Sequence, residues 1–205
     1  MVSVYDIRPC SLGEGPLWHP LRGELFWFDI NAHQLLSKTA VWQFDEYVSA
    51  AGWISKDELL VASESQLFRF HLGDHTQTKI CDLEANNPIT RSNDGRCDPR
   101  GGFWIGTMGK KAEAKAGAIY RYYRGDLVHL FPEITIPNAI CFAPDGHTAY
   151  FTDTPLQQIL AVDLDADGWP CSAPRVAVDL TGTAENPDGA VVDAQGNIWN
   201  AQWGA

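Results

Sequence analysis

Residues 138–154 read NAICFAPDGHTAYFTDT, and this stretch decides the fold class. It begins with a polar residue, continues as a short apolar run, turns at Pro144 and Gly146, and ends in a second run rich in aromatic residues. Two short runs of this kind around a Gly-containing turn predict a β-hairpin whose glycine has a positive φ. The stretch therefore predicts a strand–turn–strand unit.

The same unit recurs along the chain. Three further copies are EGPLWHPLRGELFWFDI (14–30), NDGRCDPRGGFWIGT (93–107) and DGAVVDAQGNIWNA (188–201). Each begins with a polar lead residue, has a turn residue six positions later, and has a glycine two or three positions after that. A degenerate copy, AAGWISKDELLVAS, lies near residue 51, and its lead position falls on small residues around Ala50.

The spacing of these copies predicts a β-propeller. Their leads are 36 to 50 residues apart, which matches one four-stranded blade per repeat. Stretches between the copies supply outer strands, and they read QLFRF (66–70), AIYRY (118–122) and QILAV (158–162). The one helix-like patch, residues 109–116, is expected to form a surface loop or a single turn.

We therefore expect an all-β fold, a six-bladed β-propeller, with residues 1–205 forming a single domain. Six blades of about 45 residues need about 270 residues. The 205 residues cover about four and a half blades, so we expect the natural protein to be longer at its C-terminus.

Composition excludes several classes of function. The formal net charge of −11 argues against nucleic acid, which needs a basic surface. No apolar run approaches the roughly 18 residues that span a membrane. The five cysteines form no CxxC pair, so neither a disulfide framework nor a thiolate zinc site is expected. The N-terminus has no signal-peptide pattern, and a cytoplasmic protein is expected.

The lead residues are candidate ligands for a metal ion. Equivalent positions of the innermost strands meet at one mouth of a propeller, so Glu14, Asn93, Asn138 and Asp188 should converge. An isolated Asp or Asn before Gly more often caps its own turn, but four leads at one repeat position favour a shared site. Carboxylate and amide oxygens suit hard divalent cations, and we expect Glu14, Asn138 and Asp188 to bind one such ion.

Other motifs give little support for different chemistry. No GxSxG elbow, Walker loop or dinucleotide-binding glycine motif occurs. DLDADG (163–168) resembles the start of a calcium loop, but Pro174 occupies the position of the required Glu, so a hairpin turn is expected. His19 and His147 fall in or beside turns and are expected to face solvent.

Four segments together resemble one known family. They are SLGEGPLWHP (11–20), RSNDGRCDPRGGFWIGTM (91–108), IPNAICFAPDGHTAYFTDT (136–154) and NPDGAVVDAQGNIW (186–199). In this order they closely resemble the SMP-30/gluconolactonase/LRE-like family, also called the regucalcin family. The likeness runs from Ser11 to Ala205, and the segment 103–125 is similar to that of bacterial sugar lactonases.

The resemblance implies roles for individual residues. Family members are six-bladed propellers that hydrolyse aldonolactones with a divalent ion, and their metal ligands fall here on Glu14, Asn138 and Asp188. Asp188 also falls on the proposed acid/base. The substrate-contacting R-x-N-D segment gives Arg91 and Asn93. At a further substrate-contacting position animal members carry Glu, and here Lys111 replaces it, which puts the identity of the sugar in doubt.

We therefore predict a carboxylic-ester hydrolase that opens sugar lactones such as gluconolactone, by a metal-polarised carbonyl and Asp-assisted attack of water. Ca²⁺ or Zn²⁺ is expected first, with Fe²⁺, Mn²⁺ or Mg²⁺ as alternatives. The partner is a small sugar lactone, with neither nucleic acid nor a membrane. Two other readings stay open: a non-catalytic calcium-binding propeller, and a hydrolase of another lactone or a phosphotriester.

Overall fold

The structure is a computed structural model that describes residues 3–204, and within them it contains five antiparallel sheets. The first blade comprises β1 (Gly13–His19), β2 (Glu24–Asp29), β3 (Gln34–Ser37) and β4 (Val41–Gln43). The second comprises β5 (Val48–Trp53), β6 (Glu58–Ser63), β7 (Gln66–His71) and β8 (Gln77–Asp82). The third comprises β9 (Thr90–Cys97), β10 (Phe103–Gly109), β11 (Gly117–Tyr123) and β12 (Asp126–Ile134). The fourth comprises β13 (Pro137–Phe142), β14 (Thr148–Asp153), the 3-10 turn η1 (Thr154–Leu156), β15 (Gln158–Asp163) and β16 (Arg175–Asp179). The last sheet has two strands, β17 (Pro187–Val192) and β18 (Ile198–Gln202).

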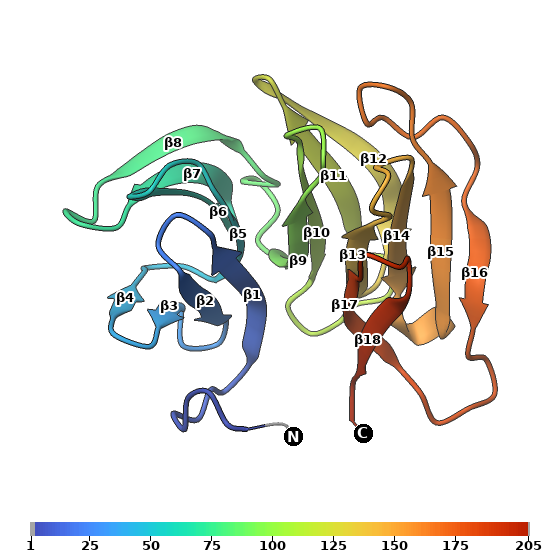
Figure 1. The fold of residues 1–205 in the computed structure, drawn as a ribbon, viewed down its shortest axis with the longest axis horizontal. Helices are drawn as coiled ribbons and strands as arrows, with labels where there is room; N and C mark the ends of the chain where they lie inside the picture. Colours follow the sequence, from blue (N-terminus) through green and yellow to red (C-terminus); the bar gives the residue numbers. More distant parts are fainter. Residues whose placement is uncertain (1–2, 205) are drawn as a thin grey trace.

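The blades follow one another around a common centre (Figure 1). Each four-stranded sheet is a meander in chain order, and the first strands of successive blades contact one another: β1 with β5, β5 with β9, β9 with β13, and β13 with β17. This arrangement confirms the all-β propeller, with four complete blades in the described residues. The count of six blades and a longer natural chain stay predictions.

The hydrophobic core lies between the blades. Phe28 and Leu35 of the first blade pack with Phe68 and Phe70 of the second. Further clusters join the second blade to the third, the third to the fourth, and the fourth to β17. Each blade therefore buries its apolar face only against its neighbours, so the position of each first strand depends on the blades beside it.

The predicted turns are confirmed. The four turn glycines all have positive φ, at Gly23, Gly101, Gly146 and Gly196. The DLDADG stretch forms a turn in which Asp165 Oδ1 accepts the backbone N–H groups of Asp167 and Trp169, both at 2.9 Å. After Gly109, the last residue of β10, residues 110–116 form a loop.

All five cysteines are free thiols, as expected. No helix among residues 3–204 is long and apolar enough to cross a membrane.

The expectation for His19 is wrong. Its side chain is fully buried, Nε2 lies 2.9 Å from the carbonyl oxygen of Ser55, and the ring packs against Phe26 and Trp53. The turn begins only after His19, which is still the last residue of β1 and points into the interface with the second blade. His147 is exposed, as predicted.

Candidate active site

A β-bulge aims the lead residues of the first and fourth blades. The pairing of β1 with β2 shifts register between Glu14 and Leu17, and β13 with β14 shifts between Asn138 and Cys141. The residue after each lead has a left-handed φ, 55° at Gly15 and 56° at Ala139. Bulges bend a strand and redirect a side chain, so these two leads have the same local backbone.

In the third and fifth sheets the bulge begins one residue earlier, relative to the lead residue, than it does in the first and fourth blades. Register shifts there between Ser92 and Gly95, and between Pro187 and Ala190. Asn93 and Asp188 therefore lie within the irregular segment. In the degenerate second blade the buried Ser49 lies at the corresponding place, and its Oγ donates to Ser92 Oγ at 2.8 Å.

A chain of hydrogen bonds runs through the lead residues of the third and fourth blades to the fifth sheet. Arg91 Nη1 donates to Asn93 Oδ1 at 2.9 Å, and Asn93 Nδ2 donates to Asn138 Oδ1 at 3.1 Å. Asn138 Nδ2 donates to Thr154 Oγ1 at 3.0 Å, and that hydroxyl donates to the carbonyl of Pro187 at 2.8 Å. The chain therefore connects two of the leads, Asn93 and Asn138, and ends at the residue before Asp188.

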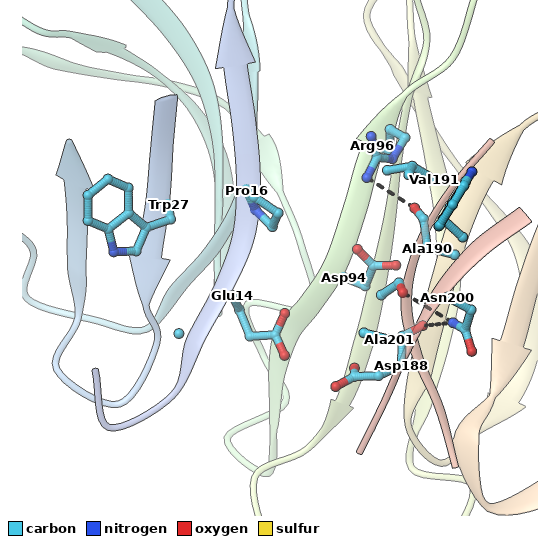
Figure 2. A pocket seen from close by; sticks show the side chains of 13 residues that line it. Glu14, Pro16, Trp27, Asp94, Arg96, Asp188, Ala190, Val191, Asn200 and Ala201 are labelled. Atoms are coloured by element: carbon cyan, nitrogen blue, oxygen red, sulfur yellow. Dashed lines mark hydrogen bonds between the residues drawn. The ribbon is translucent and has the colours of Figure 1, made fainter. Parts of the chain in front are cut away.

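Three carboxyl groups face a cavity of about 660 Å³ beside this chain. Figure 2 shows Glu14 on β1 and Asp188 on β17 pointing toward each other across it, with Asp94 nearby on β9. Arg96 also lines the cavity, and its Nη2 donates to the carbonyl of Ala190 at 3.2 Å. Residues from three sheets therefore line one open cavity, in which charged groups lie among apolar side chains.

The electrostatics of this space favour positive charge. Burial, followed by the charges of Asp188 and Asp94, raises the pKa of Glu14 to about 7. Burial also raises the pKa of Asp94 to about 6 and raises that of Asp188. Arg91, which opposes the shift at Glu14, is the weakest of the causes there. A divalent cation would offset the negative charge that these groups carry when ionised.

The donor set fits such an ion. Glu14 and Asp188 supply carboxylate oxygens, and Asn138 Oδ1, which accepts one hydrogen bond from Asn93, keeps a second lone pair. Hard divalent cations bind oxygens of these types. No group of three His, Cys, Asp or Glu side chains within residues 3–204 could hold a metal ion, so the predicted set with Asn138 as its third ligand stays a prediction.

The predicted substrate residues divide into two groups. Arg91 and Asn93 are buried beside Asn138, and like Asn138 they are not among the residues that line the cavity. Lys111 lies in the loop after β10 with an exposed side chain and is not among the residues that line the cavity. Its neighbour Lys110 forms an ion pair with Glu64 at 3.1 Å. A role for Lys111 in substrate binding stays a prediction.

Two residues that line the cavity were not predicted, Asp94 and Arg96. Asp94 Oδ2 accepts the backbone N–H of Ile140 at 2.8 Å, and Arg96 Nε donates to the carbonyl of the same residue at 3.0 Å. Both belong to the segment that follows the lead Asn93, and strict alternation along a strand would have turned Asp94 away from the site. Their position next to Asn93 was the only feature of the sequence that could have indicated that they lie at the site.

Comparisons with known proteins identify relatives of this chain. Residues 12–205 match the family model SMP-30/gluconolactonase/LRE-like region. The L-arabinolactonase of Azospirillum brasilense is 35% identical over 206 residues, covering 95% of this chain and 68% of that protein. The pentonolactonase XacC of Haloferax volcanii is 32% identical over 203 residues, covering 95% and 67%. The crystal structure of a calcium-binding protein, regucalcin, from Agrobacterium tumefaciens superposes with a TM-score of 0.95 at 43% identity, covering 97% and 70%. The chain belongs to the SMP-30/gluconolactonase/LRE-like family.

Proposed function

We propose that this protein hydrolyses sugar lactones, with one divalent metal ion held by Glu14, Asn138 and Asp188. The observation that carries the proposal is the placement of Glu14 and Asp188 around one cavity, next to the hydrogen-bond chain through Asn93 and Asn138. Relatives that are named lactonases support the same class of substrate, an intramolecular ester of a sugar acid.

The chain's residues have distinct parts in this reaction. A divalent ion bound to these oxygens would polarise the ester carbonyl and make a nearby water more acidic. Asp188 accepts a proton as water adds to the carbonyl carbon, and it returns that proton to the ring oxygen when the C–O bond breaks. The products are a carboxylic acid and a free hydroxyl, so atoms and charge balance.

Arg91 and Asn93 orient the substrate. Arg91 uses Nη1 for its hydrogen bonds to Asn93 Oδ1 and the carbonyl of Ser92. The remaining donors of its guanidinium are proposed to hold sugar hydroxyls or the developing oxyanion. Lys111, on the loop after β10, is proposed to contact the distal end of the sugar.

The test follows proton release from glucono-, galactono-, xylono- and arabinono-lactones. We expect hydrolysis above the spontaneous rate that is lost with a chelator, returns with a divalent metal, and falls at least about a hundredfold in Asp188→Ala, the size of loss typical for an acid/base group. If no lactone is hydrolysed faster than in buffer with metal present, the proposal fails.

A second candidate is a calcium-binding propeller without catalysis. It is favoured by the regucalcin structure, which is described as a calcium-binding protein. Calcium binding that Asp188→Ala abolishes, with no acceleration of any lactone or phosphotriester, would establish it instead. The particular sugar, the resident metal and a cytoplasmic location stay predictions.

A further inference from the structure

Two buried aspartates outside the cavity occupy equivalent places in the first and fourth blades. Asp29 ends β2 and pairs with Gly13, and Asp153 ends β14 and pairs with Pro137. Gly13 and Pro137 directly precede the leads. Each aspartate is only 6% exposed.

Asp29 holds the backbone that leads into Glu14. Its Oδ2 accepts the N–H of Ser11 at 2.7 Å, and its Oδ1 accepts the N–H of Leu12 at 3.0 Å. The carbonyl of Leu12 in turn accepts the N–H of Ile30 at 3.0 Å. Both the N–H groups and a carbonyl group of the two residues before Gly13 are thus hydrogen-bonded to the end of β2.

Asp153 repeats this arrangement at Asn138. Its Oδ2 accepts the N–H of Thr135 at 3.1 Å, and its Oδ1 accepts the N–H of Ile136 at 2.8 Å. The carbonyl of Ile136 accepts the N–H of Thr154 at 3.0 Å. The offsets from the lead residue are the same as in the first blade.

The chemistry of the contact requires a carboxylate. In both blades each carboxylate oxygen accepts one N–H group, an arrangement that an Asn does not reproduce, because its Nδ2 is a donor. A buried carboxylate is costly unless it is hydrogen-bonded. A buried carboxylate occurs at the same place in two blades, which indicates that the backbone N–H groups before the lead residue need an acceptor there.

The other three sheets have different side chains and different hydrogen bonds at this position. Ser63 pairs with Val48, and Thr107 pairs with Ser92. Their hydroxyls donate to Glu46 and Glu84, at 2.5 Å and 2.8 Å, in the loops that precede β5 and β9. In the fifth sheet Gln202 occupies the position, and its Nε2 donates to a neighbour on β18 at 2.6 Å. The double N–H contact therefore occurs in the two blades whose leads are Glu14 and Asn138.

We propose that Asp29 and Asp153 are positioning residues for the metal site: through the backbone N–H groups that they accept, they hold Glu14 and Asn138 at the angle the ion needs. This inference rests on the proposed metal-binding function. Groups that orient metal ligands typically change metal affinity by about 10- to 100-fold when they are replaced.

The test compares Asp29→Asn and Asp153→Asn with Asp165→Asn. Asp165 also accepts two backbone N–H groups, in a turn outside the cavity. Calcium affinity is measured by calorimetric titration of chelator-treated protein. We expect each of the first two variants to bind calcium at least about tenfold more weakly, with lactonase activity recovered at saturating calcium, whereas Asp165→Asn keeps the wild-type affinity.

The control isolates the lost acceptor: Asp29→Asn and Asp153→Asn each replace one of the two accepting oxygens by an N–H donor, whereas Asp165→Asn keeps a single oxygen of the kind that accepts both N–H groups there. Should a variant unfold without metal, its affinity is read as the calcium concentration that restores the native near-ultraviolet circular dichroism. Wild-type affinity in both Asp29→Asn and Asp153→Asn, or an equal loss in Asp165→Asn, would overturn the inference. A wild-type chain that binds no divalent metal would instead contradict the proposed function.

Discussion

Glu14 shows most directly how the site works at the scale of single residues. Its carboxyl group is partly buried and faces Asp188 and Asp94 across the cavity, which raises its pKa to about 7. The fold therefore favours the protonated form of this side chain in the absence of a metal. A bound cation would favour the ionised form instead. The repulsion among the ionised carboxyl groups would then be offset by their attraction to the cation.

This shift predicts how stability depends on pH in metal-free protein. With a pKa raised from 4.5 to about 7, Glu14 binds more protons in the folded than in the unfolded state between these values, so its ionisation lowers the free energy of unfolding as pH rises through that window. Glu14→Gln should therefore be more stable than wild type at pH 7 and nearly equal at pH 4.5. Urea unfolding in the presence of chelator measures the difference.

Two observations would test whether the ionisation of Glu14 causes this pH dependence. Calcium should raise the stability of wild type at pH 7 and leave Glu14→Gln much less affected. A variant with the same pH dependence as wild type between pH 4.5 and 7 would show that Glu14 does not titrate as described.

Asn93 connects Arg91, a proposed substrate residue, to Asn138, a proposed metal ligand. Asn93→Ala removes the donor to Asn138 Oδ1 and the acceptor for Arg91 Nη1. Each buried hydrogen bond lost costs about 1–3 kcal/mol, and about 1.4 kcal/mol corresponds to tenfold. We expect kcat/KM for a hydrolysed lactone to fall at least about tenfold, with a raised KM. Initial rates measure this, and the exposed Asn197→Ala should leave them unchanged.

At the scale of elements, the bulge in β1 depends on a single glycine. Gly15 has a φ of 55°, and a Cβ there would lie 2.2 Å from the carbonyl oxygen of Ser49 on β5. Gly23 in the following turn has a φ of 62°, but no atom lies within 4 Å of its added Cβ. A side chain at either position would have to adopt the left-handed backbone conformation, but only at Gly15 would it also clash with a neighbouring strand.

Gly15→Ala should therefore be far more harmful than Gly23→Ala. The left-handed conformation alone costs about 1–2 kcal/mol with a side chain, and at Gly15 the backbone of β5 must move as well. We expect Gly15→Ala to lose more stability in urea unfolding and also to weaken calcium binding. Equal losses in the two variants would contradict the role of the β1–β5 contact.

The sequence predicted the elements from repetition, because each hairpin carries its own turn residues. The lead residues Glu14, Asn138 and Asp188 followed from the same periodicity. Asp94 was missed because a bulge in β9 breaks the alternation of side chains on which the prediction relied. His19 was misplaced because burial depends on the neighbouring blade, and no local pattern in β1 reports that contact.

At the scale of the whole molecule, a buried ion pair within the third blade also contacts the fourth blade through its arginine. Arg121 Nε donates to Asp98 Oδ2 at 2.7 Å, with both side chains fully buried, and Arg121 Nη2 donates to the carbonyl of Asp167 at 2.8 Å. The guanidinium also packs on Tyr123 and Trp169. The contact lies outside the cavity, so it stabilises the ring without taking part in the chemistry.

Arg121→Met should destabilise the protein because it leaves Asp98 buried without its charge partner. Breaking one side of a buried pair typically costs about 3–5 kcal/mol. The double variant Arg121→Met/Asp98→Asn should lose less than the sum of the single variants in urea unfolding. Strict additivity would show that the two side chains do not stabilise each other, and calcium affinity of the folded protein should not change.

The measurement that tests the central claim most directly is a metal titration of chelator-treated protein that follows bound calcium and the rate of lactone hydrolysis together. The account predicts that both rise in parallel and saturate at one calcium ion per chain, and that neither rises in Asp188→Ala. Full hydrolytic rate without bound metal, or stoichiometric calcium binding without any hydrolysis of the sugar lactones, would contradict it.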